Sequence, residues 1–386
     1  MNSQSLAPKY FQIFAIGYGV SLIIDPSGNL LPYFSMFMIM YGLVAGFNSA
    51  AGKQFTPMVI LVVAILPLAA FNCLISSDPT ASTLKWFLWL MALLGMTLMS
   101  LRCKAELEER MVKTIGPAFL ITWFVLAIKG NAVAESARDK AASLHLSAFY
   151  ANLVIATGMF IPQKFWRVVV VSIAVVGGLT SGSRATFLFL PLVFTPALIY
   201  YYRVRISSIF LITVIVGALF LIMNNETLQS LTFGRKGGDN IGSFDSLELA
   251  EKSAGGRAAL REMGVDYIKK QPWGYGYGQS IDIILEGKSM GNNLHNGYLN
   301  VATQMGVHVF LIYISLFIWL IYKLTTDQRV SRISRFFTLS VVTCVSLRAV
   351  SESFSLFDLG HPASFLTIFL ISVFIIRSRN PHKQFV

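Results

Sequence analysis

Long apolar runs alternate with short polar connections along most of this chain. A helix needs about 20 mostly apolar residues to cross a bilayer, and about twelve runs approach that length. The expected spans are residues 10–24, 30–47, 57–75, 84–101, 112–128, 142–161, 166–180, 185–202, 207–223, 297–322, 336–357 and 362–376. This pattern predicts an all-α, polytopic integral membrane protein with about twelve transmembrane helices.

One long polar interval, from Asn224 to Asn300, interrupts the pattern. Residues 256–270 within it are predicted to form a helix, because Ala259, Met263 and Tyr267 share one face at i, i+4 spacing. The proline and glycines of residues 272–278 end that helix in a turn.

The interval divides the chain into three parts. Residues 1–223 hold the first nine expected spans, and residues 224–296 form a large loop with short helices. Residues 297–386 hold the last three spans and a polar tail.

Composition and charge support this assignment and orient the chain. Hydrophobic residues make up 55% of the sequence and charged residues only 13%, against about 25% charged in soluble domains. The net charge of +12 does not indicate a nucleic-acid partner, because the basic residues sit in short clusters at the ends of spans. With both termini in the cytoplasm, 17 Lys and Arg residues fall on inner segments and six on short outer connections. The long loop is therefore expected outside the cytoplasm.

Three residues place charge or a titratable ring at the outer rim of the spans: Arg184, Arg257 and His295. Arg184 separates two short spans, where a guanidinium either reaches lipid head groups or grips a phosphate through two parallel hydrogen bonds. Arg257 begins the predicted loop helix, where backbone N–H groups favour anions, or else lies on a solvated face. His295 can take a proton from a hydroxyl at neutral pH, or it has a structural role.

Several familiar sites are missing from the sequence. It has no glycine-rich phosphate loop, no His-Glu-x-x-His and no Asp-x-Asp pair to hold a metal beside a nucleotide sugar. Cys73, Cys103 and Cys344 lack metal-ligand spacing. We therefore expect no metal and no cofactor. Asp25 precedes Pro26, which is typical of a turn, although some membrane glycosyltransferases keep a catalytic acid in the first outer loop.

Residues 179–186, residues 256–276 and residues 295–299 together resemble the bacterial O-antigen ligase and O-antigen polymerase superfamily in order, spacing and side of the membrane. The resemblance covers roughly residues 140–376. It implies a metal-independent glycosyltransferase with a C-type membrane fold. Such an enzyme takes a glycan from undecaprenyl diphosphate at the periplasmic face of the inner membrane.

The resemblance also implies residue roles. Arg184 and Arg257 would hold the lipid-linked diphosphate, and His295 would activate the acceptor hydroxyl. The further residues expected to contact the substrate are Asn296, Tyr298, Lys85, Arg261, Arg348 and Glu352. Arg348 and Glu352 either pair beside the site or form a structural ion pair within the bundle.

Two types of enzyme within the superfamily, and one class of protein outside it, are compatible with the sequence. A ligase passes the glycan to lipid A–core oligosaccharide, and a polymerase passes it to another lipid-linked repeat unit. Residues 184–191 and their spacing to His295 are more similar to ligases, although Asn293 stands where some ligases have a second histidine. A polysaccharide or lipid transporter is the alternative class, but it would be expected to show related halves and polar helices at mid-membrane.

Overall fold

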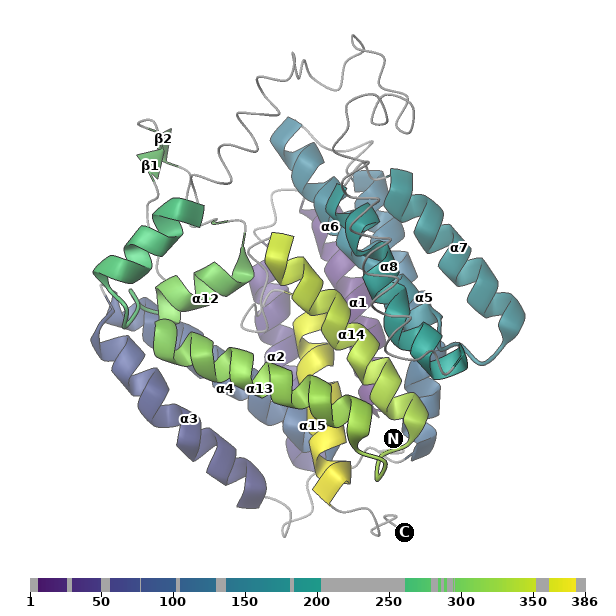
Figure 1. The fold of residues 1–386 in the computed structure, drawn as a ribbon, viewed down its shortest axis with the longest axis horizontal. Helices are drawn as coiled ribbons and strands as arrows, with labels where there is room; N and C mark the ends of the chain where they lie inside the picture. Colours follow the sequence, from purple (N-terminus) through teal and green to yellow (C-terminus); the bar gives the residue numbers. More distant parts are fainter. Residues whose placement is uncertain are drawn as a thin grey trace.

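The computed structural model of this 386-residue chain describes residues 6–25, 30–49, 56–76, 78–101, 105–129, 137–180, 184–202, 261–278, 284–285, 288–289, 294, 296–351 and 361–379. Within these residues the longer helices are α1 (Leu6–Ile24), α2 (Leu30–Ser49), α3 (Thr56–Leu74), α4 (Pro79–Ser100), α5 (Ala105–Ile128), α6 (Ala137–Gly158), α7 (Lys164–Thr180), α8 (Arg184–Tyr202), α12 (Gly297–Met305), α13 (Val307–Thr326), α14 (Arg332–Ser351) and α15 (Pro362–Arg379). Residues 261–270 form a further helix (Figure 1). One antiparallel hairpin, β1 (Ile284–Leu285) with β2 (Lys288–Ser289), was not expected of an all-α chain.

The described apolar runs form helices where the sequence predicts them, with two qualifications. The expected span at residues 207–223, and residues 352–357 of the span expected at 336–357, lie outside the described residues. The expected continuous span at residues 297–322 is wrong, because the helix ends at Met305 and a new one starts at Val307. Gly306 between them has a φ of 93°, which a right-handed helix cannot contain.

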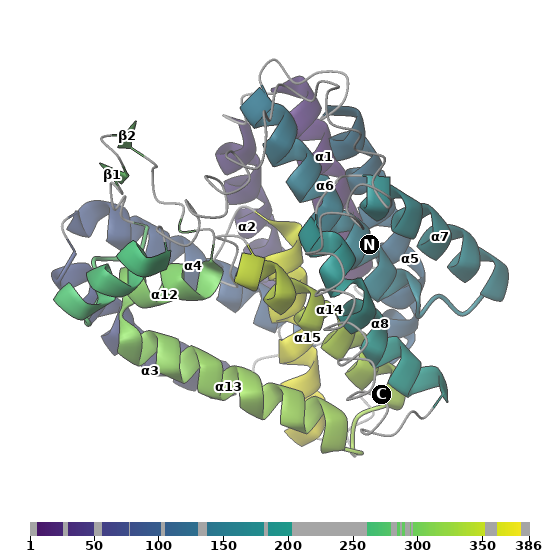
Figure 2. The same ribbon diagram turned by 45° about the horizontal axis from the view of Figure 1, so that its top comes forward.

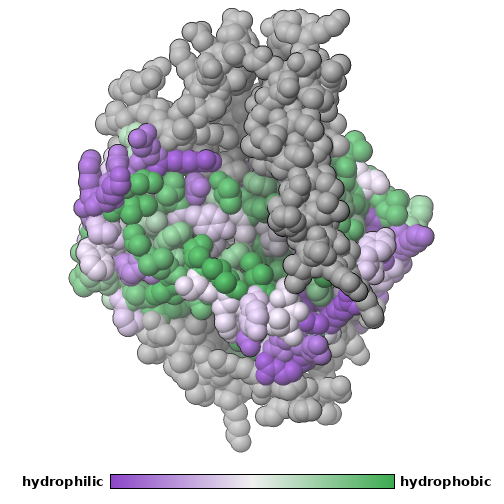
Figure 3. All heavy atoms as spheres, in the orientation of Figure 1, coloured by the Kyte–Doolittle hydropathy of each residue, from purple (hydrophilic) through white to green (hydrophobic). Residues whose placement is uncertain are grey.

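The length and the apolar composition of the described helices are those of a helical membrane protein. Four of its helical segments are long and apolar enough to cross a bilayer: α4, residues Arg110–Ile128 of α5, α13, and residues Arg332–Val350 of α14. Several shorter apolar helices accompany them. Figure 3 shows the apolar belt, with hydrophilic residues at its upper left and lower right margins.

The helices form a central bundle with two flanks (Figures 1 and 2). α1, α2, α4, α5, α6, α14 and α15 pack around one core that includes the fully buried rings of Tyr10, Phe14 and Phe365. α7 and α8 cover one side, while α3, α12 and α13 lie on the other. The helix of residues 261–270 and α12 lie side by side, on the side of the bundle away from α7 (Figures 1 and 2).

Small residues let the most closely packed helices approach one another. A Cβ on Gly95 of α4 would come within 2.9 Å of the Leu43 backbone nitrogen of α2. A Cβ on Gly116 of α5 would meet the Gly158 Cα of α6 at 3.4 Å. Close backbone contact of this kind is the usual way in which membrane helices gain packing energy.

A buried carboxylate ties the turn between α13 and α14. Asp327 accepts hydrogen bonds from Arg329 Nε at 2.8 Å, Arg329 Nη2 at 2.6 Å and the Arg329 backbone N–H at 3.0 Å. The Arg329 guanidinium thereby holds the pKa of the Asp327 carboxyl well below its usual range. A depressed carboxyl pKa stabilises the fold above the unfolded value of about 3.9, and this contribution is lost as pH falls through the folded value.

We therefore expect Asp327→Asn to lower the thermal unfolding temperature of the purified protein at pH 7. The difference from wild type should shrink as the pH is lowered below about 4, because Asp327 then binds a proton in the unfolded wild-type protein while it is still ionised in the folded one, which favours unfolding. Unfolding temperatures of both proteins over a pH series measure this. A difference that grows on acidification would contradict the assigned ion pair.

Candidate functional site

The break between α12 and α13 is the structural centre of the candidate site. Ending a helix leaves backbone carbonyls without partners, and starting one leaves N–H groups without partners. Here the turn at residues 271–278 supplies the partners. The backbone N–H groups of Tyr275 and Gly276 donate to the carbonyls of Thr303 and Gln304 at 2.9 and 2.8 Å.

The first N–H of the new helix is satisfied by the same turn. Val307 donates its backbone N–H to the Pro272 carbonyl at 2.9 Å. A Cβ on Gly306 would collide with the Trp273 carbonyl, and one on Gly276 would collide with the Ser76 hydroxyl. The glycines therefore permit this contact, and the predicted end of the loop helix in a turn at Pro272 is confirmed.

Asn72 of α3 joins the turn to the membrane helices. It is fully buried, and its Oδ1 accepts hydrogen bonds from Trp86 Nε1 at 2.9 Å and from the Tyr277 backbone N–H at 2.8 Å. Its Nδ2 donates to the Gln304 carbonyl at 3.0 Å. Ser82 adds a bond from its hydroxyl to the Tyr277 carbonyl at 3.0 Å. One amide thus connects α3, α4, the turn and the end of α12.

The helix of residues 261–270 packs directly on the segment that leads to His295. Leu294 is 1% exposed and contacts Met263 and Tyr267, two of the residues predicted to share a helix face. Gly264 lies against the Leu294 side chain as well. The third residue of the predicted face, Ala259, lies outside the described residues.

The residue after His295 is the N-cap of α12. Asn296 caps the helix, because its Oδ1 accepts the Leu299 backbone N–H at 3.0 Å. Its Nδ2 donates to the Val350 carbonyl at 3.4 Å, and Tyr298 donates its hydroxyl to the Ser346 carbonyl at 3.2 Å. Both side chains thereby fasten α12 to the end of α14, so their polar groups serve protein contacts.

Arg348 lies at the same end of α14, between the two residues that accept these bonds. Its guanidinium carbon is 5.6 Å from the ring centroid of Phe149 on α6. The structure therefore places Asn296 and Tyr298 against the last turns of α14, where Arg348 lies over a ring of α6. The predicted pairing of Arg348 with Glu352 is untested, because Glu352 lies outside the described residues.

The structure describes some of the other predicted site residues and leaves out the rest. Lys85 is exposed, and its methylene groups run along Gly278 at the end of the turn. Arg261 is exposed on the helix of residues 261–270. Arg184 is the first residue of α8, and its side chain is not among those described. Arg257 and His295 lie outside the described residues.

Three features of this region were not predicted from the sequence. They are Asn72, the break at Gly306, and a hydrogen bond of 3.0 Å between the Tyr18 hydroxyl and His361 Nδ1 that joins α1 to the start of α15. Asp25 accepts the Leu30 backbone N–H at 2.7 Å, as the turn interpretation predicts. Within the described residues, no group of three His, Cys, Asp or Glu side chains is arranged to hold a metal ion.

Comparison with known proteins identifies a protein family. Residues 168–314 match the protein family described as O-antigen ligase, whereas no curated protein matches the chain. The matched segment contains Arg184, the helix of residues 261–270, the turn and α12, and it excludes Lys85 and Arg348. The chain therefore carries a region of the O-antigen ligase type at residues 168–314, and its resemblance to the O-antigen ligase and polymerase superfamily is confirmed.

Proposed function

We propose that this protein is an O-antigen ligase. It transfers a glycan from undecaprenyl diphosphate to lipid A–core oligosaccharide at the periplasmic face of the bacterial inner membrane, without a metal ion. In this proposal the fold is of the C type, both termini are cytoplasmic and residues 224–296 lie in the periplasm. The match at residues 168–314 supports the coarser part, an enzyme that handles lipid-linked glycans.

The observation that carries the proposed site is the anchoring of the chain on both sides of His295. Leu294 is buried against the helix of residues 261–270, and Asn296 caps α12. Other parts of the protein therefore hold both Leu294 and Asn296. We place the general base between these two residues, because a base must stay within hydrogen-bond reach of the proton that it removes.

The proposed reaction is a displacement at the anomeric carbon of the donor. The His295 imidazole takes the proton of the acceptor hydroxyl, whose oxygen forms a bond to that carbon. The bond from the carbon to the diphosphate oxygen breaks, and undecaprenyl diphosphate leaves with the electron pair. Arg184 and Arg257 stabilise the charge that the diphosphate gains, so they act more strongly on the transition state than on the donor.

The remaining predicted contacts take supporting roles in this proposal. Asn296 and Tyr298 position His295 through α12, because their polar groups are bonded to the protein. Lys85, Arg261 and Arg348 lie at the margins of the site, where they attract an anionic donor. Long-range attraction of this kind raises the rate of encounter more than the affinity.

Arg184→Lys should lower glycan transfer by about tenfold to a hundredfold, because lysine keeps the charge but loses one of two parallel hydrogen bonds, worth roughly 1.5–3 kcal/mol. Transfer rates of the purified variants measure this. Arg110→Lys is the matched control, since Arg110 is an exposed arginine of α5 outside the family match. Wild-type rates for Arg184→Lys would favour an arginine that merely reaches lipid head groups.

Deletion of the gene followed by lipopolysaccharide gels tests the function itself. Loss of a ligase leaves core without long chains and accumulates lipid-linked polymer. Core that bears a single repeat would instead identify a polymerase, and an unchanged gel pattern would contradict both activities.

A further inference from the structure

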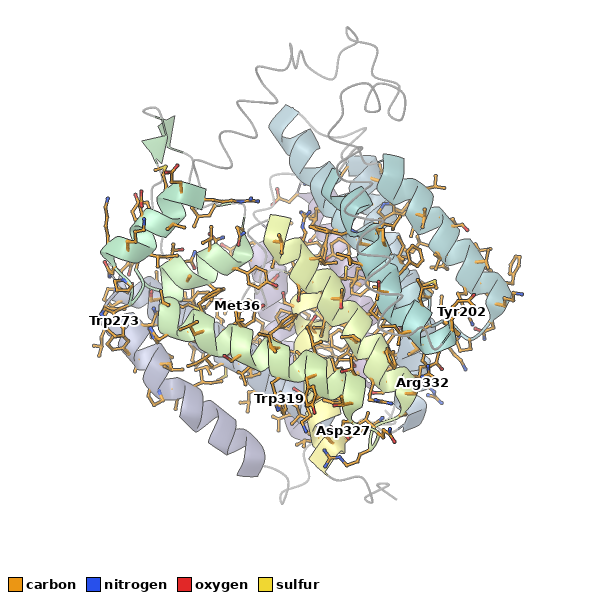
Figure 4. All side chains as sticks on the ribbon, in the orientation of Figure 1. Met36, Tyr202, Trp273, Trp319, Asp327 and Arg332 are labelled. Atoms are coloured by element: carbon orange, nitrogen blue, oxygen red, sulfur yellow. The ribbon has the colours of Figure 1, made fainter. Side chains whose placement is uncertain are left out.

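Arg332 and Arg335 lie in the first turn of α14, at the end of the bundle remote from the candidate site. α13 has 20 residues and starts at the break, so its other end is about 30 Å away. The short turn at Asp327 leads from there into α14, which returns toward the candidate site and contacts Asn296. Figure 4 shows Arg332 and Asp327 at one corner of the molecule, together with Tyr202 at the end of α8. In the proposed orientation this corner faces the cytoplasm.

Aromatic rings hold two guanidinium groups at this corner. The guanidinium carbon of Arg332 lies 5.5 Å from the ring centroid of Tyr200, and that of Arg167 lies 4.5 Å from the ring centroid of Tyr201. The two rings are 4.7 Å apart, so both guanidinium groups rest on one aromatic pair at the end of α8. Each also donates to a backbone carbonyl, at 2.9 Å for Arg332 and 2.8 Å for Arg167. We call Arg167, Arg332 and Arg335 the arginine cluster.

The described acidic residues do not balance the charge of the arginine cluster. Arg335 is 8% exposed, its Nη1 donates to the Thr325 carbonyl at 3.1 Å, and its buried Nε has no hydrogen-bond partner. Asp327 in the nearby turn gives both of its carboxylate oxygens to Arg329, and no ion pair joins the cluster to a described acidic residue. The start of α14 carries the positive end of the helix dipole as well, which favours an anion. The cluster therefore has positive charge available for an anionic ligand.

The surroundings of the cluster indicate an anion that belongs to a lipid. Tyr202 is 74% exposed at the end of α8, and Trp166, next to Arg167, is 57% exposed. Exposed Trp and Tyr rings are enriched at the level of the lipid head groups. From this level α7 continues with exposed Val168 and Val176, which offer an apolar face to acyl chains. A phosphate at the guanidinium groups and acyl chains along α7 match the two parts of a phospholipid.

We propose that the arginine cluster binds the phosphate of an anionic phospholipid of the surrounding bilayer. A guanidinium has five N–H groups, so Arg167 and Arg332 have donors left for phosphate oxygens beyond their contacts with backbone carbonyls. Arg335 adds attraction through its buried charge. Basic pockets between membrane helices bind anionic head groups in this way. The bound lipid joins α7, α8 and α14 at a place separate from the proposed transfer reaction.

Binding of phosphatidylglycerol to the purified full chain in detergent, measured by native mass spectrometry, tests the site. Arg167→Gln and Arg332→Gln should each weaken this binding by about tenfold, because a charge-assisted hydrogen bond to the phosphate is lost. Binding of phosphatidylcholine with the same acyl chains should change less, since its head group has no net charge. Arg110→Gln is the matched control, because Arg110 is an exposed arginine of α5 outside the cluster. Equal affinities of Arg110→Gln and Arg332→Gln for phosphatidylglycerol would overturn the site.

Photolabelling of the wild-type protein gives a second result that does not depend on the folding of a variant. Phosphatidylglycerol with a photoreactive group in its head group should label the start of α7, the end of α8 and the start of α14, as mapped by mass spectrometry. Unlabelled phosphatidylglycerol should displace the probe, whereas phosphatidylcholine should not. Labelling elsewhere, or equal displacement by both lipids, would overturn the proposal. Displacement by millimolar inorganic phosphate would assign the cluster to a soluble anion and would overturn the lipid site as well.

Discussion

His295→Ala is expected to abolish glycan transfer while the protein still inserts and accumulates in the membrane. A general base contributes about 10²–10⁴-fold to a rate, and no other imidazole is expected from the sequence at this position of the loop. The assay is transfer of a lipid-linked glycan to its acceptor, with protein level and unfolding temperature recorded alongside.

His308→Phe provides the matched histidine control. The His308 ring packs on Phe71 and Trp273, and neither of its ring nitrogens has a hydrogen-bond partner. Phenylalanine keeps this packing, so transfer should persist. Full transfer by His295→Ala would remove the assignment of the base, whereas equal losses in both variants would indicate a general structural effect.

Asn72→Leu should have the second largest effect, although Asn72 is not proposed to contact the substrate. The substitution removes the buried acceptor of Trp86 Nε1 and of the Tyr277 N–H, and one of the two donors to the Gln304 carbonyl. Each lost acceptor costs about 1–3 kcal/mol, so the total is at least about 2 kcal/mol. We expect an unfolding temperature lower by several degrees and a large loss of transfer, because the turn and the end of α12 lose their hydrogen bonds to Asn72 of α3.

Asn152→Leu on α6 is the matched control for that variant. Asn152 is 6% exposed, and its Oδ1 has no hydrogen-bond partner. Replacing an unsatisfied amide by an apolar side chain of similar size should be nearly neutral or stabilising. If Asn72→Leu and Asn152→Leu unfold at similar temperatures, the three bonds of Asn72 do not hold the turn in place.

The membrane helices could be predicted because the bilayer leaves the backbone few choices. A chain in hydrocarbon must satisfy its own N–H and C=O groups, so a long apolar run becomes a helix whatever its neighbours do. α8 and α15 start and end close to their expected bounds for this reason. The break at Gly306 depends on more than the local sequence, because a glycine is common in membrane helices and marks an end only where other groups take over the hydrogen bonds.

Asn72 shows why the framework of the site escaped prediction. Its partners Trp86, Tyr277 and Gln304 are 14, 205 and 232 residues away in the sequence. A single amide in an apolar run gives no sign of such distant contacts. The loop helix was predictable because its apolar face repeats locally, and Met263 and Tyr267 do pack on the segment before His295.

Asn296 and Tyr298 illustrate the opposite case. Their position beside His295 predicts contact with the substrate, and this contact stays a prediction. The structure adds that their polar groups hold α12 on α14. Those contacts could not be predicted from the sequence, because the accepting carbonyls of α14 lie some 50 residues later.

The proposed transfer is tested most directly by measuring cleavage of the bond between the glycan and its lipid carrier. Purified protein in sealed vesicles receives a lipid-linked glycan and an acceptor lipid, and the release of undecaprenyl diphosphate is measured together with the glycosylated acceptor. A glycosyl transferase should form both products in equal amounts, and only when the acceptor is present. Movement of the intact lipid-linked glycan across the vesicle membrane, with neither product formed, would show a transporter and contradict the proposed enzyme.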